Sequence, residues 1–125
     1  MQTSDYKQLK VWQKAMNLTM EIYRLVKFLP REETYALSDQ LRRAVVSIPS
    51  NIAEGHGRGT DKEFIKFLWI ARGSLLEVET QLIICNRLTL IKVEESKFAQ
   101  SLIVEVGKML NALITYRTNK SNPNT

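Results

Sequence analysis

The sequence predicts an all-α protein that folds as an antiparallel, up-down-up-down four-helix bundle. Four segments repeat apolar residues at alternating steps of three and four, the spacing that places side chains on one face of a helix. Proline, glycine and polar residues separate the segments, and connections this short force each helix to run antiparallel to the one before it. We therefore expect one bundle domain over residues 1–117. Residues 118–125 are polar and include Pro123, which predicts a disordered C-terminal tail.

The first helix is predicted between Asp5 and Pro30. Ser4 or Asp5 can accept hydrogen bonds from the free amides of its first turn. Pro30 marks its end, because the residue before a proline disfavours helical geometry. The apolar face of this helix consists of Val11, Ala15, Leu18, Ile22, Leu25 and Leu29.

The second helix contains a proline in its interior. Pro49 cannot donate a hydrogen bond to the Val45 carbonyl, so we expect one helix with a kink. Gly55 and Gly57 are expected to end it, because glycine tolerates the left-handed conformation common at helix C-termini. Its apolar face consists of Leu37, Leu41, Ala44, Ile48 and Ile52.

The third helix has the clearest start. Thr60 and Glu63 have the spacing of a capping box, in which each residue satisfies a free amide of the other. The apolar seam that follows consists of Phe64, Leu68, Ala71, Leu75, Val78, Leu82 and Cys85.

The fourth helix is predicted to open at Glu94 and Glu95, since acidic residues are favoured in a first turn. Its apolar face is expected to consist of Phe98, Leu102, Val106, Met109 and Leu113.

Helices three and four carry more apolar residues than one seam needs. The second stripe of helix three consists of Ile65, Trp69, Leu76 and Ile83, and that of helix four of Ile103, Leu110 and Ile114. A helix that is apolar on two sides is buried on two sides, which predicts self-association with the helix-three stripe as the oligomer interface. A wide core-facing surface in a monomer is the alternative, because exposed apolar residues are common.

The composition indicates a cytoplasmic protein without a membrane segment. No apolar run approaches the length of about eighteen residues that spans a bilayer, and the N-terminus lacks the order of a signal peptide. Cys85 is the single cysteine, so it cannot form an internal disulfide and fits a reducing compartment.

Basic residues are concentrated near both ends of the sequence. The formal net charge is +5 and the pI about 9.5, which favours an anionic partner. Residues 1–30 hold five Lys or Arg against two acids, and residues 91–125 hold five against three. Residues 31–90 balance at eight and eight. Helices one and four are neighbours in the predicted bundle, so these basic segments should adjoin.

Neither a catalytic site nor a metal or cofactor site is expected. His56 is the only histidine, and the sequence has no Glu-x-x-His pair of the kind that di-iron bundles require. His56 lies in a glycine-flanked turn where nothing in the sequence orients it as a base. The turn from Gly55 to Thr60 leaves one alternative open, because free amides beside Arg58 could hold a phosphate. Turn formation alone also explains its glycines, and the Gly-Lys-Ser/Thr ending of a P-loop is absent.

Three stretches carry a resemblance to a known family. Residues 42–58 read Arg-Arg-Ala-Val-Val-Ser-Ile-Pro-Ser-Asn-Ile-Ala-Glu-Gly-His-Gly-Arg, and residues 63–77 and the opening at 9–15 continue the likeness. Over about residues 5–116 the sequence resembles the four-helix bundle family of 23S ribosomal RNA intervening-sequence proteins. That family is similar in turn to accessory proteins of diversity-generating retroelements. The resemblance implies an up-down bundle that associates into cyclic pentamers. For the retroelement branch it implies binding of nucleic acid and of a reverse transcriptase; for most of the family it implies no established activity.

A polar row runs beside the core seam of the second helix. A turn centred near residue 58 would set Arg43 opposite Gly73 and Ser74, and Gln40 near Glu77. Gly73 costs helix stability, which is explained if a large neighbour approaches it closely. We expect a buried hydrogen-bond network that includes Gln40, Arg43, Ser47, Asn51, Gly73 and Glu77. A ligand site made by the same residues is the alternative.

Two functions fit these patterns. Cations at helical spacing on the outer face of helix one, together with one at the start of helix three, predict a surface for RNA or DNA backbone that an oligomer would repeat. These residues are Lys10, Lys14, Arg24, Lys27 and Arg58. A charged outer face is usually only solvated, so the alternative is a scaffold that docks a partner such as a reverse transcriptase. Both hypotheses describe a non-enzymatic accessory protein.

Overall fold

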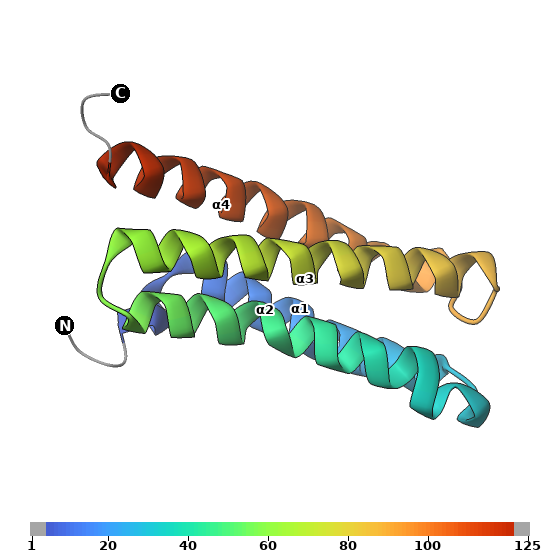
Figure 1. The fold of residues 1–125 in the computed structure, drawn as a ribbon. Helices are drawn as coiled ribbons and strands as arrows, with labels where there is room; N and C mark the ends of the chain where they lie inside the picture. The colour runs from blue at the N-terminus through green and yellow to red at the C-terminus, as the bar shows by residue number, and fades with distance from the viewer. Residues whose placement is uncertain (1–4, 122–125) are drawn as a thin grey trace.

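The computed structural model describes residues 5–121, apart from the side chains of residues 34 and 35, and every regular element in that range is helical. The four main helices are α1 (Lys10–Leu25), α2 (Asp39–Gly57), α3 (Asp61–Arg87) and α4 (Lys97–Ser121). Each helix packs against the one before it, and α4 also packs against α1, so the helices form a closed ring of neighbours (Figure 1). The predicted antiparallel four-helix bundle is confirmed.

Short helical turns connect the main helices. A 3₁₀ turn, Asp5–Gln8, precedes α1, and two more, Val26–Phe28 and Arg31–Glu33, follow it. A π-helical turn, Thr34–Ser38, leads into α2, and the 3₁₀ turn Glu94–Ser96 leads into α4. The starts of α1 and α3 and the ends of α2 and α4 lie together (Figure 1), and we call this the α2–α3 end of the bundle.

The core of the bundle follows the apolar spacing of the first three helices. Their predicted inward positions are all buried except Leu37, which is partly buried and packs against the core. The buried set includes Cys85 and also Ile91, which lies in the α3–α4 connection. Periodicity therefore identifies the core of α1, α2 and α3 correctly.

The predicted apolar face of α4 is partly wrong. Phe98 is 59% exposed, whereas Ile103, Leu110 and Ile114 are buried. The other buried residues of α4 are Ala99, Leu102 and Val106, so the inward face of α4 is rotated relative to the predicted stripe and takes in residues of both stripes. The second stripe of α4 therefore belongs to the core and gives no support for self-association.

The ends of the helices differ from prediction in three places. Leu9 precedes α1 and makes no side-chain cap, while Asp5 begins a separate 3₁₀ turn; Ser4 lies outside the described residues. The glycine with positive φ is Gly59, at +85°, and Gly55 and Gly57 are still inside α2. The α2–α3 turn therefore takes its left-handed residue two positions later than Gly57.

The start of α3 matches its prediction in part. The amide of Glu63 donates to Thr60 Oγ1 at 3.3 Å, as in a capping box. The Glu63 carboxylate lies 4.0 Å from Arg58 instead of returning to the Thr60 amide. At the other end of the chain, α4 continues through Ser121, so the first four residues of the predicted tail are helical. Residues 122–125 lie outside the described part of the chain.

Candidate interaction surfaces

A hydrogen-bonded polar cluster joins α2 to α3. The hydroxyl oxygens of Ser47 and Ser74 lie 2.7 Å apart, and Ser74 is buried. Asn51 Nδ2 donates to Ser47 Oγ at 2.9 Å and to the Ser47 carbonyl at 2.8 Å. Paired hydroxyls at this position fix two helices in one register, because any slip would leave a buried polar atom without a partner.

The register between α2 and α3 differs by one helical turn from the predicted one. Gln81 Nε2 donates to Gln40 Oε1 at 3.4 Å, so Gln40 lies opposite Gln81 instead of Glu77. The observed pairs are symmetric about residues 60 and 61, whereas the prediction centred the turn near residue 58. In an antiparallel pair, moving the centre by about two residues moves every partner by about four, which is one turn.

Arg43, Gly73 and Glu77 lie outside the polar cluster. The Arg43 side chain is 82% exposed and pairs with Asp39 of its own helix at 3.4 Å. A Cβ added to Gly73 would meet no atom within 4 Å, so the predicted close approach of an α2 side chain to Gly73 is wrong. Glu77 is exposed and makes no hydrogen bond or ion pair with the residues that the structure describes.

Thr19 lies against the carbonyl that Pro49 leaves without a helical donor. Pro49 is buried inside α2, which continues through it. Thr19 Oγ1 of α1 donates to the Ala15 carbonyl at 2.8 Å and lies 3.4 Å from the Val45 carbonyl oxygen. The contact with Val45 is long, so its stabilising effect is small. No pattern in the sequence indicates this role for Thr19, because its position opposite Val45 depends on how α1 and α2 pack.

Gly55 allows α2 and α3 to approach closely near their connected ends. A Cβ built on Gly55 would lie 2.5 Å from Phe67 Cβ and 3.2 Å from Phe64 Cδ1. Because one of these atoms is the first carbon of a helical side chain, a larger residue would push the two helices apart. Gly55 therefore has a packing role in the structure, which replaces the helix-ending role predicted for it.

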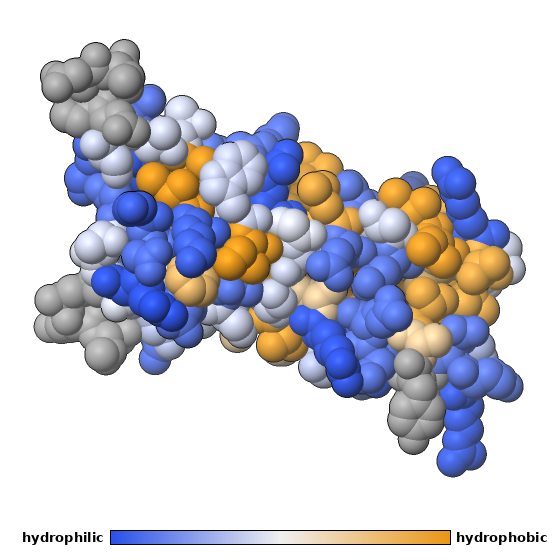
Figure 2. Space-filling view, in the orientation of Figure 1, coloured by the Kyte–Doolittle hydropathy of each residue, from blue (hydrophilic) through white to orange (hydrophobic). Residues whose placement is uncertain are grey.

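The second apolar stripe of α3 remains on the surface of the single chain. We call the residues Ile65, Trp69, Leu76 and Ile83 the α3 stripe. Trp69 is 52% exposed, and Leu76 and Ile83 are 46% and 40% exposed. Val104 of α4, which is 52% exposed, lines the same shallow pocket as Leu76 and extends this surface across the two helices. Several separate hydrophobic patches interrupt the polar surface on the face seen in Figure 2.

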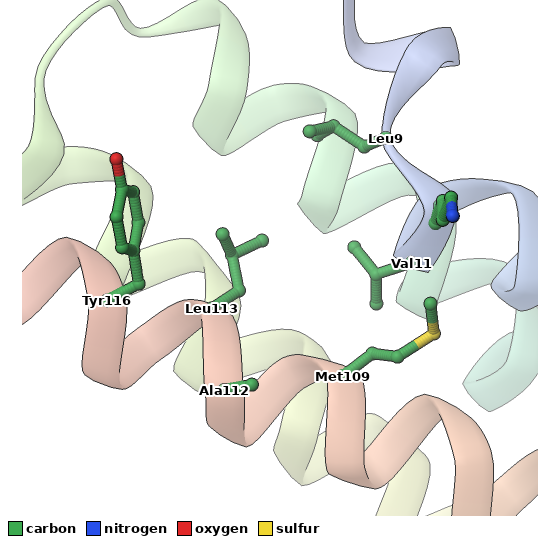
Figure 3. Close-up of a pocket in the computed structure, with 7 residues that line it drawn as sticks. Leu9, Val11, Met109, Ala112, Leu113 and Tyr116 are labelled. Carbon is green, nitrogen blue, oxygen red and sulfur yellow. The ribbon is translucent and has the colours of Figure 1, made fainter.

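A second apolar surface lies between the start of α1 and the second half of α4. It is a pocket of about 350 Å³, which we call the α1–α4 groove. In Figure 3, Leu9 and Val11 face Met109, Leu113 and Tyr116 across an open gap. The lining residues are Leu9, Lys10, Val11, Met109, Ala112, Leu113 and Tyr116. The single chain therefore exposes apolar surfaces on two different sides.

Two of the predicted nucleic-acid residues on α1 pair with acids. Lys14 Nζ lies 3.2 Å from Glu105 of α4. Arg24 donates to both carboxylate oxygens of Glu21, at 2.9 and 2.7 Å, and Glu21 is buried. The hydrogen bond to Glu21 raises the pKa of Arg24 above its ordinary value, although desolvation opposes the shift. The Lys14 pair joins the exposed surfaces of α1 and α4, and the Arg24 pair lies within α1, so an acid partly neutralises each cation.

The other three predicted nucleic-acid residues lie at different places. Arg58 Nε donates to Glu54 at 3.0 Å, and its guanidinium covers the Phe67 ring at 5.1 Å. Lys10 and Lys27 are exposed and have no acidic partner in the described part of the chain. The structure therefore does not gather the five residues into one free basic surface.

The positive charge gathers at the α2–α3 end of the bundle. The segments that meet there, residues 5–14, 54–66 and 115–121, hold eight Lys or Arg against four Asp or Glu. The rest of the chain holds ten against nine, so this end carries +4 of the net +5. Any attraction for polyanions should therefore be strongest at this end of the bundle.

Within residues 5–121 no three His, Cys, Asp or Glu side chains come close enough to hold a metal ion.

Burial, with the nearby charge of Glu33 as the second cause, raises the pKa of the Cys85 thiol to about 11. That thiol is uncharged near neutral pH and is therefore a poor nucleophile. In the same range, no helix has the length and apolar character needed to cross a bilayer.

The sequence model of a known family, described as 23S rRNA-intervening sequence protein, matches residues 7–112. The chain belongs to this family. The resemblance expected from the sequence is confirmed, while the further relation to retroelement accessory proteins stays a prediction. The match covers α1, α2 and α3 in full and stops inside α4.

A solved structure also supports the assignment of this protein to the 23S rRNA-intervening sequence family. It is a protein with unknown function from the S23 ribosomal protein family of Bacteroides thetaiotaomicron, with 30% sequence identity and a TM-score of 0.77. The alignment covers 83% of the chain and 97% of the solved one. A comparison with curated proteins gave no match.

Several residues of the stretch 42–58, which carries the family resemblance, have packing roles in this 23S rRNA-intervening sequence family protein. Ser47 and Asn51 form the α2–α3 cluster, Pro49 is buried, and Gly55 permits the close helix approach. These contacts give Ser47, Pro49, Asn51 and Gly55 roles in the fold.

Proposed function

We propose that the protein is a non-enzymatic scaffold that assembles with copies of itself. The observation that carries this proposal is the α3 stripe, where Trp69 is 52% exposed in the middle of a helix. Exposure of several large apolar side chains along one helix is unfavourable in water and is typical of interaction sites. Gly73 adds support, because it lies in open space between Trp69 and Leu76 and costs helix stability without any benefit inside the chain.

Two different apolar surfaces favour a heterologous contact, in which the α3 stripe of one copy packs into the α1–α4 groove of the next. Lys10 borders the groove, whereas Arg72, Glu79 and Lys108 line the pocket beside Leu76, so this pairing rests on the two apolar surfaces and not on charge. Heterologous contacts repeat from subunit to subunit and close into a ring when the rotation permits. The ring of five that the family resemblance implied remains a prediction.

Light scattering coupled to size exclusion tests this function. The wild-type mass should be a multiple of 14.4 kDa at micromolar concentration. Trp69→Glu should shift the population toward monomer, because an unpaired charge buried in an interface is costly. Met20→Glu is the matched control, since Met20 is 61% exposed on the outer face of α1 and away from both surfaces. A wild-type mass near 14.4 kDa would rule the scaffold out.

Nucleic-acid binding is a second candidate function, favoured by the concentration of charge at the α2–α3 end. A ring would place the same +4 end of every copy on one side, which increases avidity for a polyanion. The name of the family refers to ribosomal RNA, which is consistent with this candidate. Binding measured over a salt series decides it, because phosphate-driven affinity falls steeply with salt. Absent or salt-insensitive binding would leave the scaffold alone.

A further inference from the structure

A polar pocket at the α2–α3 end of the bundle has no role in the contacts described so far. Its volume is about 190 Å³, and it lies between the end of α2, the start of α3 and the last turns of α4. The side chains in its lining that can donate a hydrogen bond to an anion are His56, Thr60, Arg117 and Lys120. Two of these side chains, Arg117 and Lys120, carry a positive charge.

Arg117 is held rigidly at this pocket. Its Nη1 donates to Asp61 Oδ1 at 2.8 Å, and its guanidinium covers the Phe64 ring at 5.1 Å. The side chain is 23% exposed, and its Nε is buried without an acceptor. A guanidinium has five N–H groups, and a single carboxylate contact leaves most of them free. Arg117 therefore keeps the capacity to bind a second anion in a fixed orientation.

The remaining lining residues leave the pocket open. His56 packs edge-on against the same Phe64 ring, with centroids 5.4 Å apart, which fixes the imidazole next to Arg117. Gly59 has a φ of +85°, and no atom lies within 4 Å of where its Cβ would be, so no side chain covers the turn there. Lys120 is exposed and has no ion-pair partner among the described residues.

The charges around this pocket favour a small anion. Asp61 is the one carboxylate in the lining, and its charge is already compensated by Arg117. Lys120 then leaves the pocket with a net positive charge, at the end of the bundle that carries +4 of the net +5. We propose that this pocket binds a phosphate group. The group is either free phosphate or a phosphate of a nucleic-acid backbone. This site does not depend on self-association; it deepens the nucleic-acid candidate by naming the side chains that would hold the phosphate.

Titration of the labelled full-length protein with inorganic phosphate, followed by amide NMR at constant ionic strength, tests the site. Saturable shifts should be confined to residues 56–61 and 117–120. Lys120→Glu should weaken binding by about tenfold or more, because a charge-assisted contact is replaced by repulsion. Lys92→Glu is the matched control at the opposite end of the bundle and should leave the affinity within about twofold, since exposed charges farther away than a Debye length are screened. Shifts that do not saturate, or equal effects of the two variants, would overturn the proposal.

A second arm distinguishes the two sources of the phosphate. If the group belongs to a nucleic acid, a single-stranded oligonucleotide should displace inorganic phosphate. Lys62 lies outside the pocket lining, so Lys62→Glu should then weaken binding of the oligonucleotide but not binding of inorganic phosphate. If free phosphate is the ligand, the same localised shifts should persist in the presence of the oligonucleotide. Oligonucleotide binding that is unchanged by Lys120→Glu would overturn the pocket while leaving the nucleic-acid candidate intact.

Discussion

Ser47 of α2 and Ser74 of α3 share a hydrogen bond of 2.7 Å across the two helices that pack most closely in the bundle. Asn51 donates to the same Ser47 hydroxyl at 2.9 Å, so three side chains form one connected cluster. A cluster of this kind contributes to register because a slipped pair would leave a hydroxyl without a partner.

The serine pair should show energetic coupling. Ser47→Ala and Ser74→Ala should each lower the free energy of unfolding by about 1 kcal/mol, and their coupling in a double-mutant cycle should be of similar size. Chemical denaturation of the four proteins measures both. Ser101→Ala is the control, because the exposed Ser101 hydroxyl donates only to the Phe98 carbonyl of its own helix. Additive single effects would show that the pair does not act as one unit.

Two glycines should respond in opposite directions when alanine replaces them. Gly55→Ala should lower the free energy of unfolding by about 1–3 kcal/mol, because its Cβ would overlap Phe67 at 2.5 Å. Gly73→Ala, measured where the chain is monomeric, should raise it by about 0.5–1 kcal/mol, since the new methyl group meets open space in a helix. Thermal or chemical unfolding distinguishes them, and a loss of stability in both variants would contradict the packing described for Gly73.

Cys85 should make stability decrease at high pH. Its pKa is raised by burial from 9.0 to about 11, so between these values the unfolded chain loses a proton that the folded chain retains. The contribution of the thiol is therefore fully present below pH 9.0 and is lost as the pH rises through about 11. Denaturation of wild type and Cys85→Ala at several pH values isolates the contribution of the thiol, because the effects of other titrating groups cancel in the difference between the two free energies of unfolding. A difference that stays constant from pH 8 to 11 would be the contrary result.

Apolar spacing alone predicts the helices and most of the core. It succeeded for α1, α2 and α3, because each of these helices buries one stripe that its own sequence defines. It is wrong for part of α4, where Phe98 is exposed and Ile103 is buried, because α4 carries two apolar stripes and its inward face takes in residues of both. Where one helix carries two apolar stripes, spacing alone does not determine which residues face the core.

The polar contacts were predictable only in part. Ser47 and Asn51 could be assigned to a network from their position beside the core seam, and both are in it. Their partner on α3, Ser74, could not be identified, because a small error in the centre of the α2–α3 connection moves the opposing residue by a full helical turn. For this reason the predicted position of Arg43 opposite Gly73 is wrong, and Arg43 pairs with Asp39. The turn from Gly55 to Thr60 is a candidate phosphate site from the sequence alone, but Arg117 and Lys120 cannot be assigned to it in that way, because they come from the end of α4.

The most direct test of the scaffold is the mass of an equimolar mixture of two variants, each defective on a different surface. Trp69→Glu disrupts the α3 stripe, and Tyr116→Glu disrupts the α1–α4 groove, where Tyr116 is 61% exposed. Light scattering should find a multiple of 14.4 kDa for wild type and 14.4 kDa for each variant alone. The mixture should reach twice that mass, because the intact stripe of one variant can still pack into the intact groove of the other. A wild-type mass of 14.4 kDa would contradict self-assembly, and a mixture that remains monomeric would contradict the pairing of these two surfaces.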